Sequence, residues 1–121
     1  MGSYAVFGGA GGVGSALARS LTSNGHQVHL IGRNEDALSN LAEEIGASYA
    51  VADATDSDAV EHALEQGPDD LSGMAYAVGT IDLKPLRRVT AEDMRHAYDV
   101  NVIGALNAAR SSRSRISEHG S

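Results

Sequence analysis

The sequence predicts an α/β fold on a parallel sheet, because short apolar runs alternate with helical patterns along the chain. The expected strands are residues 4–7, 27–31, 48–52 and 74–78. The expected helices are residues 13–23, a second running from an Asn34 cap to Gly46, a third from a cap at Thr55 or Ser57 to Gly67, and residues 91–110. Right-handed crossovers give the strand order 3-2-1-4 with helices on both faces. This is a Rossmann-type doubly wound sheet, truncated to four strands.

Composition limits the partners that the chain can have. Its 121 residues, 42% hydrophobic and 21% charged, suffice for one globular domain. A net charge of −7 argues against nucleic acid, whose binding needs a basic surface. With no cysteine and no histidine pair at i,i+4, neither thiolate chemistry nor a metal site is expected. No apolar run could span a membrane and no leader precedes the first strand, so we expect a cytoplasmic protein.

A glycine-rich loop joins the first strand to the first helix, and this context predicts a dinucleotide site. Backbone N–H groups at the helix N-terminus can hold a pyrophosphate where no Cβ intervenes. The loop residues expected to bind it are Gly8, Ala10, Gly11, Gly12, Val13 and Gly14. Two glycine patterns fit the spacing, Gly9-x-Gly11-x-x-Gly14 and Gly8-x-x-x-Gly12-x-Gly14. The alternative is a glycine-rich turn without a ligand.

The end of the second strand indicates which cofactor is bound. NAD sites usually carry an acid there for the ribose 2′-hydroxyl, whereas NADP sites carry an arginine for the 2′-phosphate. Here the strand is followed by Arg33 and Asn34, a planar cation and a further donor. We therefore expect NADP(H) in preference to NAD(H). The competing interpretation is that Arg33 is a solvated surface residue.

Several motifs resemble the short-chain dehydrogenase/reductase family. The Gly8-x-x-x-Gly12-x-Gly14 loop is similar to the cofactor loop of that family, and Asp53 with Ala54 resembles its adenine-binding pair. The resemblance also implies that Ala77, Val78 and Gly79 lie beside the cofactor and that Asn101 holds the position of a proton-relay residue. It implies hydride transfer between the nicotinamide and a carbonyl or alcohol.

The family's catalytic pair has no counterpart in these 121 residues. The family uses a Tyr followed four positions later by a Lys, and none of the four tyrosines here is followed in that way. We therefore expect residues 1–110 to form an NADP(H)-binding Rossmann domain and residues 111–121 a polar tail. The domain is either an incomplete oxidoreductase, a non-catalytic NADP(H)-binding module, or a structural remnant that oligomerises.

The sequence also predicts self-association. The fourth strand, residues 74–78, would have an unpaired outer edge, and such edges recruit other chains. The helix over residues 91–110 carries more apolar side chains than one sheet face can bury. A homo-oligomer joined through that helix, that edge or both is expected.

Overall fold

The computed structural model describes residues 2–78, 91–92, 95, 99–113 and 115–116. Its sheet consists of β1 (Ser3–Phe7), β2 (Gln27–Gly32), β3 (Ser48–Val51) and β4 (Gly73–Tyr76). All three strand pairings are parallel and the order is β3-β2-β1-β4, as predicted. The strands therefore end together at one edge of the sheet, the edge at which open α/β folds bind ligands.

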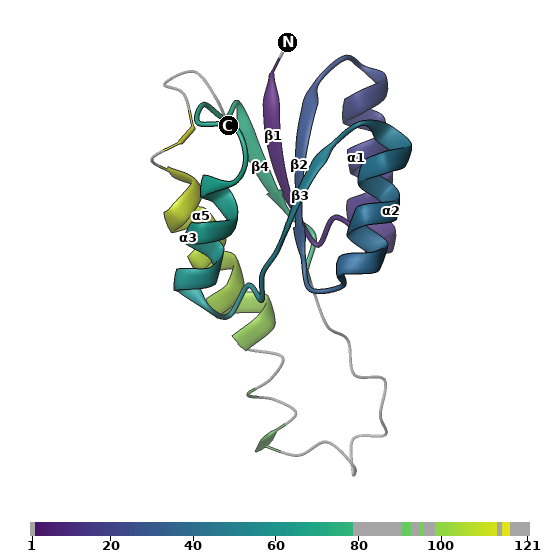
Figure 1. Cartoon of the computed structure of the whole chain (residues 1–121). Helices are drawn as coiled ribbons and strands as arrows, with labels where there is room; N and C mark the ends of the chain where they lie inside the picture. Colours follow the sequence, from purple (N-terminus) through teal and green to yellow (C-terminus); the bar gives the residue numbers. More distant parts are fainter. Residues whose placement is uncertain (1, 79–90, 93–94, 96–98, 114, 117–121) are drawn as a thin grey trace.

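Helices cover both faces of this sheet (Figure 1). The helices α1 (Gly12–Ser23) and α2 (Glu35–Ile45) lie on one face, and α3 (Ser57–Glu65) and α5 (Gly104–Arg113) lie on the other. A five-residue π-helix, η2 (Asp99–Ile103), leads directly into α5. Within the described residues, no helix is both long and apolar enough to cross a membrane.

Alternation along the central strands divides the core between the two faces. In β1, Val6 packs toward the α1 and α2 side and Phe7 toward the α3 and α5 side. Leu30 and Ile31 of β2 divide in the same way, and all four side chains are buried. Strands buried on both faces appear in the sequence as continuous apolar runs, which is why a parallel sheet covered on both faces was predictable.

One histidine belongs to this core. His29 of β2 is 1% exposed, with Nε2 2.9 Å from the Ala63 carbonyl and Nδ1 2.7 Å from the Ser48 hydroxyl. A carbonyl can only accept, so Nε2 carries the proton and Nδ1 accepts from the hydroxyl of Ser48. Burial lowers the pKa of His29, and the bond to Ala63 opposes this shift more weakly. The ring is a neutral link between β2, β3 and α3.

The cap of α3 differs from the prediction of Thr55 or Ser57. The N-cap is Asp56, whose carboxylate oxygen accepts from the N–H groups of Asp58 and Ala59 at 3.1 and 3.2 Å. Thr55 uses its hydroxyl instead to donate to Asp53 at 2.7 Å. A carboxylate that accepts two N–H bonds is the better cap, since the positive end of the helix dipole also favours its charge.

The helix predicted over residues 91–110 is not uniform, and it ends later than expected. Residues 91, 92 and 95 are helical, η2 interrupts the α-helical pattern, and α5 continues to Arg113. Residues 93–94 and 96–98 of the expected helix lie outside the described residues.

The polar tail expected from residue 111 is partly structured. Ser112 is fully buried, and Ile116 forms a parallel bridge with Leu71, just before β4. The N–H of Leu71 donates to the Arg115 carbonyl at 2.6 Å. Ile116 packs against the core beneath α3 and α5, which provides the apolar contact that orders this segment. This bridge lies at the approach to β4; β4 itself pairs only with β1 among the described residues, so it is an edge strand of the sheet there.

Candidate functional site

The glycine-rich loop leaves β1 in a conformation that glycine adopts readily. Gly8 has a φ of +79°, which a side chain would disfavour. Its N–H donates to the Ile31 carbonyl at 2.7 Å, and the N–H of Gly11 returns to the Gly8 carbonyl at 3.0 Å. The loop is thus a tight turn tied to β2, and α1 begins immediately after it.

Three of the loop glycines are required by the packing of the fold. A Cβ on Gly8 would lie 2.8 Å from the carbonyl carbon of Ala77, and a Cβ on Gly9 would lie 2.7 Å from Leu30 Cδ2. A Cβ on Gly14 would collide with the carbonyl oxygen of Gly8. At Gly8 and Gly14 a side chain would meet backbone atoms and force the loop away from its neighbours, whether or not a ligand is bound, whereas at Gly9 the nearest atom is the end of the Leu30 side chain.

Gly12 is different, because nothing in the fold requires it to be glycine. Apart from its chain neighbours and the backbone of its own helix turn, no described atom lies within 4 Å of a Cβ built there, and its φ is not positive. A Cβ on Gly11 would meet only the Gly8 oxygen, at an ordinary contact distance of 3.4 Å. Gly8 makes the tight turn, and Gly14 allows the close packing of α1 against the loop. Gly12 is the position between them where the space is open. This matches the Gly8-x-x-x-Gly12-x-Gly14 pattern.

Among the three helices within residues 2–78, α1 is the one whose N-terminus lacks a side-chain cap. Its N-cap is Gly11, whereas Asn34 and Asp56 cap α2 and α3 through their side-chain oxygens. The first turn of α1 contains no acid, and its Val13 is 75% exposed. The first N–H groups of a helix have no partner within it and carry the positive end of its dipole. This terminus is therefore suited to an anion.

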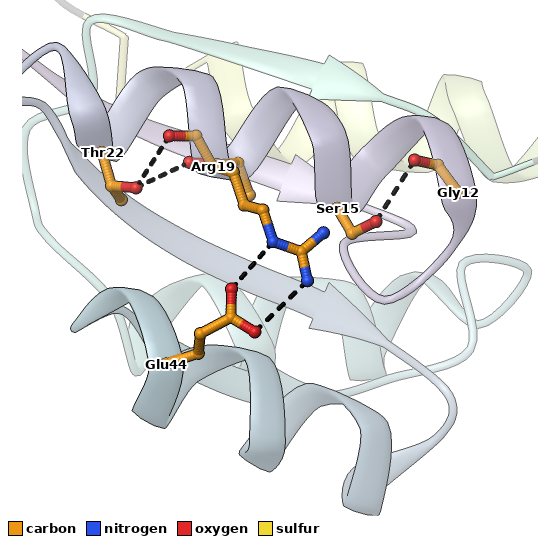
Figure 2. Close-up of polar contacts among 6 residues, drawn as sticks. Gly12, Ser15, Arg19, Thr22 and Glu44 are labelled. Atoms are coloured by element: carbon orange, nitrogen blue, oxygen red, sulfur yellow. Dashed lines mark hydrogen bonds and ion pairs between the residues drawn. The ribbon is translucent and has the colours of Figure 1, made fainter.

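Two side chains on α1 also make contacts beside the loop (Figure 2). The Ser15 hydroxyl donates back to the Gly12 carbonyl at 3.2 Å. The Arg19 guanidinium meets Glu44 of α2 through two bonds of 2.8 and 3.3 Å, and this pairing holds the pKa of Glu44 below its usual value. Both partners are about half exposed, so the pair orients α1 against α2 more than it stabilises the fold.

A largely apolar cleft of about 100 Å³ lies beside the loop, at the carboxyl ends of the strands. Whole small-molecule sites are commonly about 300–1,000 Å³, so this cleft fits one flat ring rather than an entire dinucleotide. Its lining residues are Phe7, Gly8, Ile31, Gly32, Arg33, Ala52, Asp53, Ala54, Thr55, Val78 and Val100.

Arg33 lines this cleft, and Asn34 lies beside it on an adjoining surface that the two residues share. Arg33 is exposed and makes no hydrogen bond or ion pair with any residue that the structure describes. The Asn34 side chain is partly committed, since its Oδ1 caps α2 by accepting the Ala37 N–H at 3.1 Å. Its amide Nδ2 is the donor that remains for a ligand. Glu35 and Asp36 line the same surface and oppose the positive charge of Arg33.

Asp53 and Ala54 form the next part of the cleft wall. An Asp53 carboxylate oxygen accepts the backbone N–H of Thr55 at 2.9 Å, which fixes the turn after β3. Ala54 is buried, and its carbonyl accepts from Asn107 Nδ2 of α5 at 2.9 Å. The turn therefore holds a carboxylate at the rim of the cleft and a small side chain in its wall.

The segment after β4 completes the part of the site that the structure describes. The Ala77 N–H donates to the Phe7 carbonyl at 2.8 Å, and Val78 lines the cleft. Gly79 lies outside the described residues. The backbone of Asn101 lies within η2, but its side chain is likewise outside the description. The arrangement accordingly brings together the loop, Arg33, Asp53 and Val78, and leaves the predicted relay position untested.

Sequence reasoning missed the contact between β4 and η2. The Tyr76 hydroxyl donates to the Val100 carbonyl, and the Tyr76 ring lies 6.2 Å from that of Phe7, centre to centre. Burial, with a smaller effect from the negative charge of Asp53, raises the pKa of Tyr76. The sequence signal was a tyrosine at the end of a strand, which is ordinary in a sheet.

Comparison with known proteins identifies the family. A sequence model described as short chain dehydrogenase matches residues 4–120. The chain belongs to the short-chain dehydrogenase family. An uncharacterized oxidoreductase of Mycobacterium tuberculosis is 33% identical over 115 residues, covering 95% of this chain and 46% of the relative. Carbonyl reductase family member 4 of Xenopus tropicalis is 27% identical over 121 residues, covering 96% and 51%.

The solved structures agree with this assignment. A dehydrogenase/reductase from Sinorhizobium meliloti 1021 superposes with a TM-score of 0.91 at 26% identity, covering 98% of this chain and 51% of the other. This short-chain dehydrogenase chain spans about half the length of the curated relatives it matches. It is a Rossmann-fold, dehydrogenase/reductase-like domain of a family that binds nicotinamide dinucleotides.

Proposed function

We propose that this domain binds NADP(H), with the pyrophosphate at the N-terminus of α1. The proposal depends chiefly on the empty space beside Gly12. The fold has room for a Cβ at this position, but a Cβ would block a phosphate that approaches the backbone closely, so a bound ligand explains why the residue is glycine. The N-terminal N–H groups of α1, among them those of Gly12 and Val13, would donate to the phosphate oxygens. The net charge of −7 makes such local donors necessary, because the global field repels an anion.

The adenosine end of the cofactor is assigned to the apolar cleft. Its volume of about 100 Å³ suits one planar base, and the Asp53 carboxylate in its lining is proposed to accept from an exocyclic amino group. Ala54, Ala77 and Val78 supply small or apolar walls, and Gly79 is proposed to continue them. The assignment of these residues rests on their adjacency and on the family resemblance.

Arg33 is proposed to bind the 2′-phosphate and so to select NADP(H) over NAD(H). Its guanidinium has no partner in the described chain, so a phosphate would displace no existing pair. Asn34 Nδ2 is available as a second donor. Glu35 and Asp36 reduce the net attraction, so we expect a moderate preference rather than an absolute one.

The reaction of the whole protein is proposed to be hydride transfer between the nicotinamide and a carbonyl or alcohol. Members of this family supply the proton through a tuned tyrosine, and a free phenol titrates too high for this at neutral pH. No Tyr-x-x-x-Lys occurs in these 121 residues, and Asn101 is proposed for the relay position only. The alternative is a non-catalytic NADP(H)-binding module or an oligomerising remnant. Because these 121 residues hold no tuned tyrosine, we expect this chain to bind NADPH without consuming it when aldehydes or ketones are added. Steady NADPH consumption by this chain would contradict that expectation, and the length of the native open reading frame separates the incomplete oxidoreductase from the module.

A homo-oligomer is proposed through the outer surface of η2 and α5. Val102 and Leu106 lie one helical turn apart, and each is 48% exposed. An apolar pair of this kind is suited to pack against a second copy. Because Ile116 and Leu71 meet beside β4, the helical surface is a better candidate than the strand edge. The cytoplasmic location expected from the sequence remains a prediction.

Calorimetric titration with NADPH and NADH tests the cofactor assignment. The wild type should bind NADPH more tightly than NADH. Arg33→Ala should raise the Kd for NADPH about tenfold, the lower end for losing a charge-assisted bond at an exposed site, and leave NADH unchanged. Arg113→Ala, which removes an exposed arginine from α5, is the matched control. Equal wild-type affinities would contradict the NADP(H) preference, and failure to bind either would contradict the function itself.

A further inference from the structure

Tyr76 connects the end of β4 to the π-helix. Its hydroxyl donates to the carbonyl of Val100, the second residue of η2. Tyr76 is not among the residues that line the cleft, whereas Val100 lines it and is 8% exposed. The phenol thus contacts the wall of the proposed cofactor cleft from behind.

The hydrogen-bond pattern of a π-helix explains why a donor is useful at this point. Each N–H in a π-helix bonds the carbonyl five residues back, whereas an α-helical N–H bonds the carbonyl four back. The α-helical pattern resumes at Gly104, and a change from the five-residue to the four-residue spacing skips one carbonyl, which then needs a donor from outside the helix. A buried carbonyl without a donor is costly. Tyr76 supplies the bond to Val100 and so favours the π-helical register over the α-helical one.

The Tyr76 hydroxyl occupies the space that a side chain at Gly104 would need. A Cβ on Gly104 would collide with the Tyr76 hydroxyl, and it would lie 3.1 Å from the Cβ of Ala54. Asn107, one turn further along α5, donates to the Ala54 carbonyl at 2.9 Å. The absence of a side chain at Gly104 therefore lets α5 approach both Tyr76 and the turn after β3.

We propose that Tyr76 is a positioning residue that holds η2 in its π-helical register, so that Val100 and Ala54 form the wall of the cofactor cleft. The inference rests on the proposed dinucleotide binding. Without the phenol hydroxyl, η2 relaxes toward an α-helix, and this turns Val100 and the neighbouring Asn101 about the helix axis. The consequence is a misshapen cleft in a domain that is still folded.

Tyr76→Phe tests this directly, with Tyr49→Phe as the control. The Tyr49 hydroxyl makes no hydrogen bond within the described residues, and the tyrosine lies on β3. In Tyr76→Phe, backbone carbon and amide NMR shifts over residues 99–104 should move toward α-helical values, and the Kd for NADPH should rise about tenfold, as for 1.4 kcal/mol. Tyr49→Phe should change neither. Unchanged shifts over residues 99–104 in Tyr76→Phe would overturn the proposal.

A second variant separates positioning from general loss of stability. Gly104→Ala should lower the Tm strongly in the presence of Tyr76, and most of this loss should disappear when Tyr76→Phe removes the colliding hydroxyl. Such non-additivity is the signature of residues in direct contact. Additive effects would overturn the contact. If the wild type binds no NADPH, the proposed function fails, and the NMR shifts and this coupling still decide the role of Tyr76.

Discussion

Replacing Gly12 by alanine should stabilise the unliganded domain while weakening its binding of the cofactor. Gly12 is the first residue of α1, its φ is not positive, and an added Cβ meets no described atom within 4 Å outside its chain neighbours and its own helix turn. Where the native backbone suits alanine, the exchange stabilises by about 0.4–1 kcal/mol, chiefly by restricting the unfolded chain. For a domain of this size that is a rise in Tm of about 2–6 °C.

The same methyl group occupies the space through which a pyrophosphate would reach the backbone of α1. Losing one charge-assisted hydrogen bond to a phosphate oxygen costs about 1.5–3 kcal/mol, which raises the Kd for NADPH about 10- to 150-fold. Thermal unfolding by circular dichroism without ligand measures the first effect. Calorimetric titration with NADPH measures the second.

Gly14→Ala is the matched comparison in the same helix turn. Its Cβ collides with the Gly8 carbonyl oxygen, so this variant should lose both stability and binding. The reasoning is refuted if Gly12→Ala binds NADPH as tightly as the wild type, or if it lowers the Tm as Gly14→Ala does. Ser20→Val on the exposed side of α1 should leave NADPH affinity unchanged.

Three further predictions concern assembly, pH and packing. The wild type should be a homo-oligomer by light scattering at micromolar concentration, and Leu106→Asp should make it monomeric by placing a charge on the exposed apolar surface. The free energy of unfolding should fall as the pH drops below about 6.5, because His29 gains a proton in the unfolded state more readily than in the folded state, where burial lowers its pKa. Urea titrations at pH 7.5 and 5.5 measure this fall, and it should be smaller in His29→Leu than in the wild type. Ser112→Ala should raise the free energy of unfolding by about 1 kcal/mol, because no donor or acceptor among the described residues satisfies the buried Ser112 hydroxyl.

Each of these predictions has a control at an exposed site. Val51→Asp changes an equally exposed apolar residue on β3, and it should leave the oligomer intact. His62→Gln removes an exposed histidine and should keep the pH dependence of the free energy of unfolding. If His62→Gln abolished that pH dependence, the role assigned to His29 would be contradicted. Ser20→Ala reports helix propensity alone, so an equal gain at both serines would mean that the buried hydroxyl is not costly.

Much of the fold could be predicted because it depends on local patterns. Continuous apolar strands, such as Val6 beside Phe7, are typical of a sheet covered on both faces, and handed crossovers then fix the strand order. The glycine loop was also visible, since its position between a strand and a helix is a sequence property. The open space beside Gly12 was not visible in the sequence, because it depends on which neighbours the fold places there.

The remaining features depend on contacts between distant segments. Tyr76 and Val100 are 24 residues apart, and no periodicity in either segment indicates that their strand and helix meet. The π-helix follows from that meeting rather than from the propensities of residues 99–103. Ile116 is the single large apolar residue of a polar segment, so nothing in the sequence indicated that it would pack. Its pairing with Leu71 follows from where the fold places Leu71.

Amide NMR during a titration with NADPH tests the central claim most directly, because it reports where the cofactor binds. The account predicts saturable shifts concentrated at the backbone amides of Gly11, Gly12 and Val13, with a further shift at Arg33 that NADH does not reproduce. Binding that leaves the amides of the α1 N-terminus unmoved, or an absence of any saturable shift, would contradict it.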